Sequence, residues 1–239
     1  MRLHPRIFTL LTCFLMSVSV AAQTQDQVDR MTKAVQFDDL AEVKKLIAAG
    51  VSPNLLVKGG NPLTVYAVRE KSKQTLDYLI GLKGVDVDHP NLSGETVLMM
   101  ASLYGMLPEV KVLVDKRGAE INKSGWTPLH YACTEGHLAV ADYLLSKGAK
   151  VDALSESDTT PLMMAVRSGN IRLVRLLLDR GADLQIRNHQ GFSQGFSAID
   201  VAELFNQEEI SKGLRSRWEK LYKTKYQGGP KPVLVESKP

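Results

Sequence analysis

The chain has 239 residues, of which 44% are hydrophobic and 23% are charged, and its formal net charge is +4. This is the composition of a globular protein, and it excludes the disordered and collagen-like classes. The small net charge indicates no nucleic-acid or membrane partner by itself. The class of protein must therefore be read from the pattern along the chain.

The first 22 residues have the pattern of a secretory signal. Two arginines precede a mostly apolar run at residues 7–20, and small residues end the segment. The run is shorter than the roughly 20 residues that a bilayer span needs. We predict cleavage after Ala22 and a periplasmic location in a Gram-negative bacterium. The alternative is a membrane anchor that is never cleaved.

Cysteine usage agrees with export of a protein that has no disulfide. Once residues 1–22 are removed, Cys133 is the only cysteine left, so no internal disulfide can form. A lone exposed thiol would be a liability in an oxidising compartment. We therefore predict that Cys133 is buried. Residues 23–28, which follow the predicted signal, are expected to form a polar leader.

A phrase of the sequence returns at a fixed period. TPLHYA at residues 127–132 is followed 33 residues later by TPLMMA at 160–165. A small residue recurs at the same place in each of six units, at Ala34, Ala67, Ala101, Ala132, Ala165 and Ala202. In the first five units, two aliphatic residues follow this alanine by 12 and 13 positions, and a glycine closes the unit. The regular register predicts six repeated units.

This pattern resembles the ankyrin repeat. GWTPLH at residues 125–130, the Gly-His pair at 136–137 and GAKVD at 148–152 reproduce nearly the whole family motif. The resemblance implies an all-α ankyrin repeat solenoid of about six helix-turn-helix units with hairpin fingers, which are the loops joining consecutive units. The resemblance covers roughly residues 29–215, and the predicted repeat domain is 29–226, with a capping unit at each end. Because one unit cannot bury its apolar face alone, the units must stack.

Several motif residues have expected structural roles. Thr127 is placed to cap the first helix of its unit, and His130 is expected to tie neighbouring capping turns together. Near the C-terminus, four apolar residues recur at helical spacing and predict a helix that docks on the preceding unit: Ile210, Leu214, Trp218 and Leu221. Glycine and proline then stop the helix, so residues 227–239 are predicted to be a disordered tail.

One enzyme signature occurs in the sequence. GFSQG at residues 191–195 satisfies the G-x-S-x-G expression of serine hydrolases, with Ser193 as the nucleophile and His189 close by. That motif requires a preceding strand in a large sheet and a histidine later in the chain, whereas here it falls in a finger. No metal-binding or phosphate-binding motif occurs either. We therefore expect a non-enzymatic protein without cofactors, and a hydrolase built on Ser193 is the minor alternative.

Stacked units form an extended concave face that is suited to another protein. The candidate binding residues lie at the ends of the first helices and on the fingers: Arg69, Leu103, Tyr104, Trp126, Thr134, Glu135, Arg167, Phe192 and Phe196. We expect Leu103, Tyr104 and Trp126 to be adjacent on successive units, flanked by Arg69 and Arg167. We predict that they form the partner surface, because tryptophan, tyrosine and arginine dominate interface energies. The alternative is that Trp126 packs on a neighbouring finger and Tyr104 covers a groove.

The last predicted helix is basic. Six cations are candidates for contact with an anionic membrane surface: Lys212, Arg215, Arg217, Lys220, Lys223 and Lys225. The competing interpretation is a solvated face of a capping helix. The expected partner is another protein and not nucleic acid, and the expected state is a monomer. The expected role is that of an inhibitor or immunity protein, or of an accessory factor for an enzyme.

Overall fold

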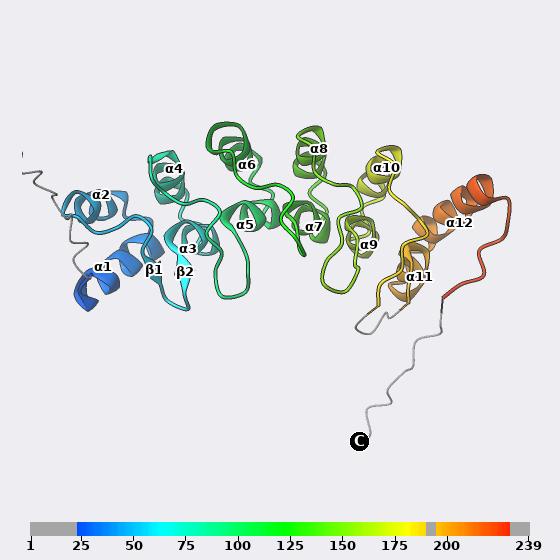
Figure 1. The fold of residues 1–239 in the computed structure, drawn as a ribbon, viewed down its shortest axis with the longest axis horizontal. Helices are drawn as coiled ribbons and strands as arrows, with labels where there is room; N and C mark the ends of the chain where they lie inside the picture. Colours follow the sequence, from blue (N-terminus) through cyan, green and yellow to red (C-terminus); the bar gives the residue numbers. More distant parts are fainter. Residues whose placement is uncertain (1–22, 190–194, 230–239) are drawn as a thin grey trace, which may run out of the picture.

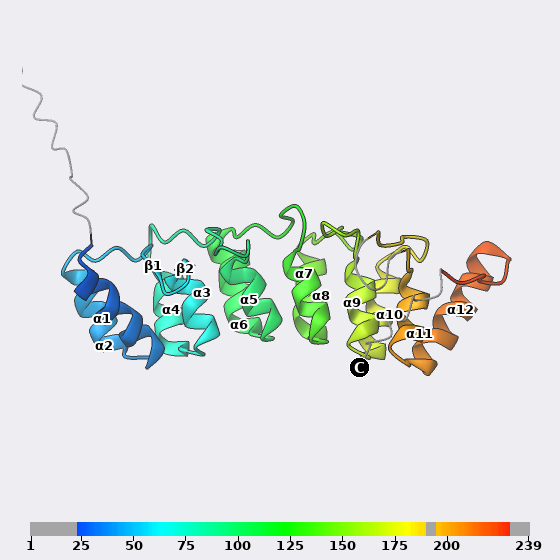
Figure 2. The ribbon, with the colours of Figure 1, turned by 90° about the horizontal axis from the view of Figure 1, so that it is seen from below.

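The computed structural model describes residues 23–189 and 195–229. In these residues twelve α-helices form six antiparallel pairs in one elongated row (Figure 1). One helix of each pair lies in an inner layer and the other in an outer layer, and the fingers project from one edge of the row (Figure 2). The predicted signal at residues 1–22 and the last ten residues of the predicted tail lie outside the described residues.

The inner layer consists of six helices, most of them two turns long: α1 (Gln25–Gln36), α3 (Leu63–Arg69), α5 (Val97–Leu103), α7 (Pro128–Thr134), α9 (Pro161–Arg167) and α11 (Ala198–Leu204). The outer layer consists of their partners: α2 (Leu40–Ala48), α4 (Lys73–Gly81), α6 (Leu107–Lys111) with the π-helical turn η1 (Val112–Lys116), α8 (Leu138–Ser146), α10 (Ile171–Asp179) and α12 (Glu208–Tyr222). In the first finger, β1 (Leu56–Val57) pairs antiparallel with β2 (Asn61–Pro62). The prediction of an all-α ankyrin solenoid is confirmed.

Hydroxyl residues set where the inner helices begin. Thr96, Thr127, Thr160 and Ser197 each precede an inner helix, and each side chain accepts a hydrogen bond from a backbone N–H of the first turn. This contact satisfies one of the donors that a helix start leaves free. The fourth and fifth units place a proline directly after the threonine, where its missing N–H has no cost.

The core follows the repeat register that the sequence predicts. The six recurring alanines are at most 5% exposed, which lets neighbouring inner helices approach closely. The first of the paired aliphatic residues is buried in every one of the first five units, from Leu46 to Leu177. Cys133 is fully buried among these side chains, as predicted. One continuous apolar core therefore runs through all six units.

The third unit carries one extra residue, which its outer helix absorbs. Gly118 follows Ala101 by 17 positions, a spacing shared by the second unit, whereas the first, fourth and fifth units have a spacing of 16. The last turn of this helix widens to a π-helix at Val112–Lys116, the usual way to hold a single inserted residue. Arg117 follows this turn and donates hydrogen bonds to the carbonyl groups of Ile80, Leu82 and Val85. The insertion thereby gains a contact with the preceding unit.

Both ends of the repeat domain are held by hydrogen bonds. Thr24 caps α1, so the helix begins at Gln25, inside the expected polar leader at residues 23–28. At the other end, Tyr226 is only 7% exposed and the backbone N–H of Gly229 donates to Asp200 at 2.7 Å. Residues 227–229, the first of the predicted tail, thus follow a docked tyrosine, and the boundary of the tail stays a prediction.

The apolar stripe of the last helix docks over most of its length. Ile210 and Leu214 are buried, and Trp218 packs against the core. Leu221 is 56% exposed, so the expectation that it docks is wrong. The place beside Trp218 is taken by the ring of Tyr226, whose centroid lies 4.9 Å from that of the indole.

Candidate partner-binding surface

Each inner helix ends in two residues that precede a tight turn. We call these positions the turn-end stripe; it comprises Gln36, Phe37, Arg69, Glu70, Leu103, Tyr104, Thr134, Glu135, Arg167, Ser168, Leu204 and Phe205. The next residue has a positive φ in all six units: Asp38, Lys71, Gly105, Gly136, Gly169 and Asn206. A left-handed residue ends the helix and reverses the chain. The stripe is thus generated by the same backbone geometry in every unit.

Hydrogen bonds between units hold these turns at fixed spacing. Both carboxylate oxygens of Asp38 accept backbone N–H groups at the start of α4, at 2.8 and 3.1 Å. Burial alone would raise the pKa of Asp38, but these two bonds outweigh burial and hold the pKa below its ordinary value. Further along, Nε2 of His137 contacts the Leu103 carbonyl at 2.8 Å, and the Asn170 amide donates to the Gly136 carbonyl at 2.8 Å.

The third turn shows why glycine is needed in the middle of the row. At Gly105 a Cβ atom would lie 2.6 Å from Nδ1 of His137, in addition to the strain of a positive φ. The next unit therefore packs directly onto this turn. The stripe is rigid there because the backbone that carries it is in contact with its neighbour.

The stripe mixes exposed aromatic and charged side chains. Phe37 is 77% exposed, Tyr104 44% and Phe205 43%, and the guanidinium of Arg167 lies 5.5 Å from the ring centre of Phe205. Arg69, Glu135 and Arg167 are exposed as well. Leu103 and Thr134 are half-buried, and the Thr134 hydroxyl donates to the His130 carbonyl at 2.9 Å within its own helix.

Trp126 lies in a second group of residues on the finger side. Its ring meets those of His130 and Tyr131 edge-to-face, with centroids 5.2 and 6.1 Å away. The Tyr131 hydroxyl donates to Glu95 at 3.2 Å, and the carboxylate of Glu156 occupies the space above the neighbouring glycine of the finger. We call Glu95, Trp126, Tyr131 and Glu156 the finger cluster.

The finger cluster has an acidic character that affects its tyrosine. Burial, together with the charges of Glu95 and Glu156, raises the pKa of Tyr131 well above its ordinary value. Tyr131 and Glu156 are not among the sequence-predicted site residues. Their signal in the sequence is weak: the positions equivalent to Tyr131 hold Met100 and Met164, which are buried, whereas Tyr131 is half-buried.

Two expectations about the surface change, and one falls outside the described residues. Leu103 and Tyr104 end α5, whereas Trp126 precedes the start of α7. The residue that contacts Leu103 is His137, which follows the turn after α7 and occupies the N-cap position of α8. Two turns of helix, about 10 Å of rise, separate the two groups, so they are not adjacent. Phe196 is 3% exposed and belongs to the core, so its expected exposure is wrong. Phe192 lies outside the described residues.

His130 has the structural role that the sequence predicts. The Thr127 backbone N–H donates to its Nδ1 at 3.1 Å, and its Nε2 contacts the Thr159 carbonyl in the next finger at 2.9 Å. Burial lowers the pKa of His130 to about 4, so the ring is neutral at pH 7. Its bonds connect the capping turns of two consecutive units.

Ser193, the candidate nucleophile, lies outside the described residues. The nearby His189 is described, and its Nδ1 lies 2.6 Å from a carboxylate oxygen of Asp158 in the preceding finger. The backbone N–H of His189 also donates to the Ser157 carbonyl at 3.0 Å. These contacts connect the last two fingers.

The basic C-terminal residues divide into two sets. Arg215 pairs with Glu203 and lies over the ring of Tyr226, and Arg217 donates to the Leu178 carbonyl at 2.8 Å. The four lysines are exposed: Lys212, Lys220, Lys223 and Lys225. The two arginines therefore fasten the helix, while the lysines face solvent.

No cluster of three metal-ligating side chains occurs within residues 23–189 and 195–229. In the same part of the chain, no helix has both the length and the apolarity for a membrane crossing.

Comparison with known proteins agrees with this architecture. A family model described as ankyrin repeats (3 copies) matches residues 31–124, 64–155 and 120–188, and the chain therefore belongs to the ankyrin repeat family. Repeats of this family form protein–protein interaction modules, with the stacked units as the scaffold.

Among curated proteins, the chain is 39% identical to mouse protein phosphatase 1 regulatory subunit 27 over 37% of its own length and 59% of the relative's. It is 32% identical to glycerophosphocholine phosphodiesterase gde1 of Schizosaccharomyces pombe, over 46% of this chain but 10% of the relative. It is 42% identical to rat ankyrin repeat and SAM domain-containing protein 6, over 28% of this chain and 8% of the relative. The matches thus span less than two thirds of these relatives.

Proposed function

We propose that this protein is a non-catalytic module that holds one partner protein across the turn-end stripe and the finger cluster. The observation that carries the proposal is the exposed Tyr104 beside the half-buried Leu103, on a turn that the next unit fixes by hydrogen bonding. A rigid aromatic anchor loses little conformational entropy on binding. Arginine and aromatic side chains at both ends of the stripe extend the same chemistry.

The chemistry of the two groups suggests what the partner presents. The stripe offers aromatic rings and arginines, which suit an apolar segment with acidic residues. The finger cluster offers two carboxylates beside an indole and a phenol, which suit a lysine or arginine side chain. A partner segment that lies across both would have an apolar, acidic end and a basic end about 10 Å apart.

Photo-crosslinking tests the location of the interface. A benzophenone amino acid is placed at Tyr104 or, as the control, at the exposed Lys111 on the outer layer. We expect partner adducts at position 104 and not at position 111. The reverse pattern, or equal labelling, would remove the proposed face.

A substitution series tests the energetics. Tyr104→Ala with Arg167→Ala removes exposed groups only, so the circular-dichroism spectrum should be unchanged while partner recovery falls at least tenfold, the result of losing about 1.4 kcal/mol. Trp126→Ala is measured separately because the indole packs on His130. Equal recovery by the wild type and both variants would contradict the proposal.

We propose that this protein controls an enzyme, either as an inhibitor or immunity protein or as an accessory factor. The similarity to a protein named as a regulatory subunit of a phosphatase supports this class of role. Once the partner is known, its activity with and without this protein separates the two roles. Loss of activity on addition indicates an inhibitor, and gain indicates an accessory factor.

We propose a periplasmic location on the pattern of residues 1–22 alone. N-terminal sequencing of protein from the osmotic-shock fraction of a Gram-negative host should give Gln23 as the first residue. Full-length protein in the cytoplasm or in the membrane fraction would contradict export with cleavage.

An alternative function is attachment to an anionic surface through the basic helix. The four exposed lysines support it, because they are free of the contacts that hold Arg215 and Arg217. Binding to phosphatidylglycerol vesicles should then fall steeply with salt and disappear when all four lysines are changed to glutamine. These changes leave the docking residues of the helix in place, so lost binding cannot be attributed to unfolding.

Hydrolysis by Ser193 is the minor alternative. The observation that supports it is the contact between His189 and Asp158, because a carboxylate that orients a histidine is part of such catalytic sites. A fluorophosphonate probe should label the wild type and not Ser193→Ala if the serine is activated. No labelling of the wild type would end this alternative.

A further inference from the structure

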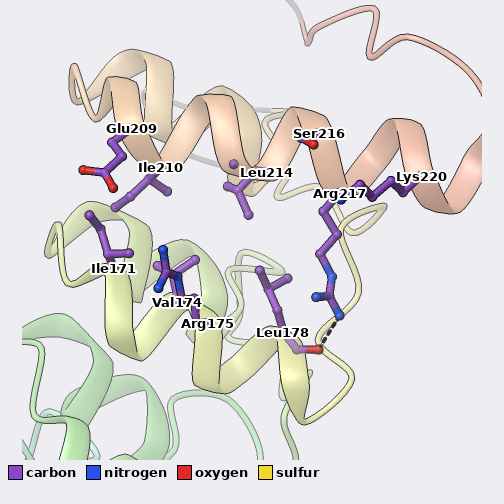
Figure 3. A pocket seen from close by; sticks show the side chains of 11 residues that line it. Ile171, Val174, Arg175, Leu178, Glu209, Ile210, Leu214, Ser216, Arg217 and Lys220 are labelled. Atoms are coloured by element: carbon purple, nitrogen blue, oxygen red, sulfur yellow. Dashed lines mark hydrogen bonds between the residues drawn. The ribbon is translucent and has the colours of Figure 1, made fainter.

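The outer layer has a hollow at its C-terminal end, between α10 and α12 (Figure 3). Its volume is about 280 Å³. Apolar side chains form its floor, with Ile171, Val174 and Leu178 from α10 and Ile210 and Leu214 from α12. The hollow lies on the layer opposite the turn-end stripe, so it is separate from the proposed partner surface.

Two small residues of α12 line this hollow. Gly213 and Ser216 both line it, and Gly213 lies in the middle of a 15-residue helix. A Cβ atom built at Gly213 would meet nothing within 4 Å, so the glycine does not serve a close approach of helices. Glycine is among the least favourable residues inside a helix. The sequence therefore accepts a weaker helix at the position where a side chain would fill the space.

The rim of the hollow is polarised in charge. Arg217 and Lys220 lie at one end, Glu209 lies at the other, and Arg175 stands between them (Figure 3). Arg217 is fixed at the rim by its bond to the Leu178 carbonyl, and one of its nitrogen atoms is 3.8 Å from Asp179. Within the described residues, Arg175 and Lys220 make no hydrogen bond or ion pair.

We propose that this hollow binds a single-chain anionic amphiphile. The acyl chain lies on the apolar floor over Gly213, and the carboxylate or phosphate head faces Lys220 and Arg217. At roughly 30 Å³ for each small group, the space holds about nine heavy atoms, which corresponds to a chain of eight to ten carbons with its head at the open end. Glu209 repels the anionic head from the opposite end and so fixes the direction of the chain.

Binding of decanoate to the wild-type protein, measured by calorimetry and by NMR titration, tests the site. Decanol has the same chain without the charge, and butyrate has the charge without the chain. We expect decanoate to bind at least fivefold more tightly than either, the effect of about 1 kcal/mol. Equal binding of decanol, or no binding of decanoate, would overturn the proposal.

Two variants locate the ligand, each with its own control. Gly213→Leu fills the hollow and should abolish decanoate binding while the melting temperature stays the same or rises, because leucine favours the helix more than glycine does. Lys220→Glu should weaken binding at least fivefold. Lys212→Glu makes the same change of charge on the opposite side of α12, where it lines a different groove, and should leave binding unchanged. Undiminished binding to Gly213→Leu would overturn the site.

Vesicles of phosphatidylglycerol identify the source of the amphiphile. If Gly213→Leu abolishes both decanoate and vesicle binding, the site takes a chain from a lipid surface. If it abolishes decanoate binding alone, the site takes a free amphiphile. Loss of vesicle binding only on removal of the exposed lysines, with decanoate bound equally by the wild type and Gly213→Leu, would refute the hollow as the site.

Discussion

Replacement of His130 by methionine should make the protein less stable at pH 7 and less sensitive to acid. The third and fifth units hold Met99 and Met163 at the equivalent position, so the fold accepts this residue. At pH 7 the change removes the contacts with the Thr127 backbone N–H and the Thr159 carbonyl, which should lower the free energy of unfolding by about 2 kcal/mol.

Acid removes the stability advantage of the wild type over the variant. Burial depresses the pKa of His130 from 6.5 to about 4, so below pH 6.5 protons bind the unfolded chain in preference to the folded one. The stability contributed by the neutral ring is complete above pH 6.5 and is lost as the pH falls toward 4. Between pH 7 and pH 5 this residue alone should lower the free energy of unfolding by about 2 kcal/mol.

Urea unfolding followed by circular dichroism at pH 7, 6 and 5 measures both effects. The other histidines are present in both proteins and cancel in the difference. The wild type should therefore be about 2 kcal/mol more stable than His130→Met at pH 7 and nearly equal to it at pH 5. Parallel pH profiles of the two proteins would refute the assignment of His130 as a buried neutral link between capping turns.

The Cys133 thiol should react with Ellman's reagent only after urea unfolds the chain, because it is fully buried and burial raises its pKa; rapid reaction in native buffer would contradict this. Gly105→Ala should lower the free energy of unfolding by about 2 kcal/mol, because the new Cβ meets the ring of His137, whereas Gly148→Ala, with a positive φ but open space, should lose about 1. Equal losses would argue against that contact. Asp200→Asn should speed trypsin cleavage near the C-terminus, because this carboxylate accepts hydrogen bonds that dock the last described residues; an unchanged rate would show that docking does not depend on it.

The repeat register could be predicted from the sequence because each unit buries the same positions. The alanines of the inner helices, the leucines of the outer helices and the capping threonines all take the places that the 33-residue period assigns. Because each unit packs against neighbours of the same shape, the same residue type recurs at the same position of every repeat. The only sign of the π-helical turn at Val112–Lys116 in the sequence is one extra residue in the unit. The sequence does not show which turn of the helix will contain it.

The surface was harder to predict because equivalent positions differ in exposure. Trp126 and Phe196 both precede a capping hydroxyl, yet the first is half-buried and the second is in the core. The backbone of Phe196 forms two hydrogen bonds with Asn188, which hold this part of the last finger against the core.

The docked C-terminal segment depends on Tyr226 reaching Asp200, 26 positions earlier in the chain. Burial alone would raise the pKa of Asp200, and the bonds from Tyr226 and from the backbone of Ser197 and Gly229 hold it below its ordinary value. No local pattern in the sequence predicts a contact over this separation. Repeat logic therefore predicts the scaffold but not how its last unit is closed.

The same unit provides the strongest argument that the outer layer has its own function. A terminal helix that only closed the stack would gain from a leucine or alanine at Gly213, because either residue favours the helix and the space above it is open. No steric reason for glycine exists among the described residues, since a Cβ there would touch nothing. A position that breaks a local rule without a packing gain is characteristic of a functional site. A ligand chain that fills the hollow would explain the glycine, and for that reason Gly213→Leu should keep or raise stability and lose the ligand in the same molecule.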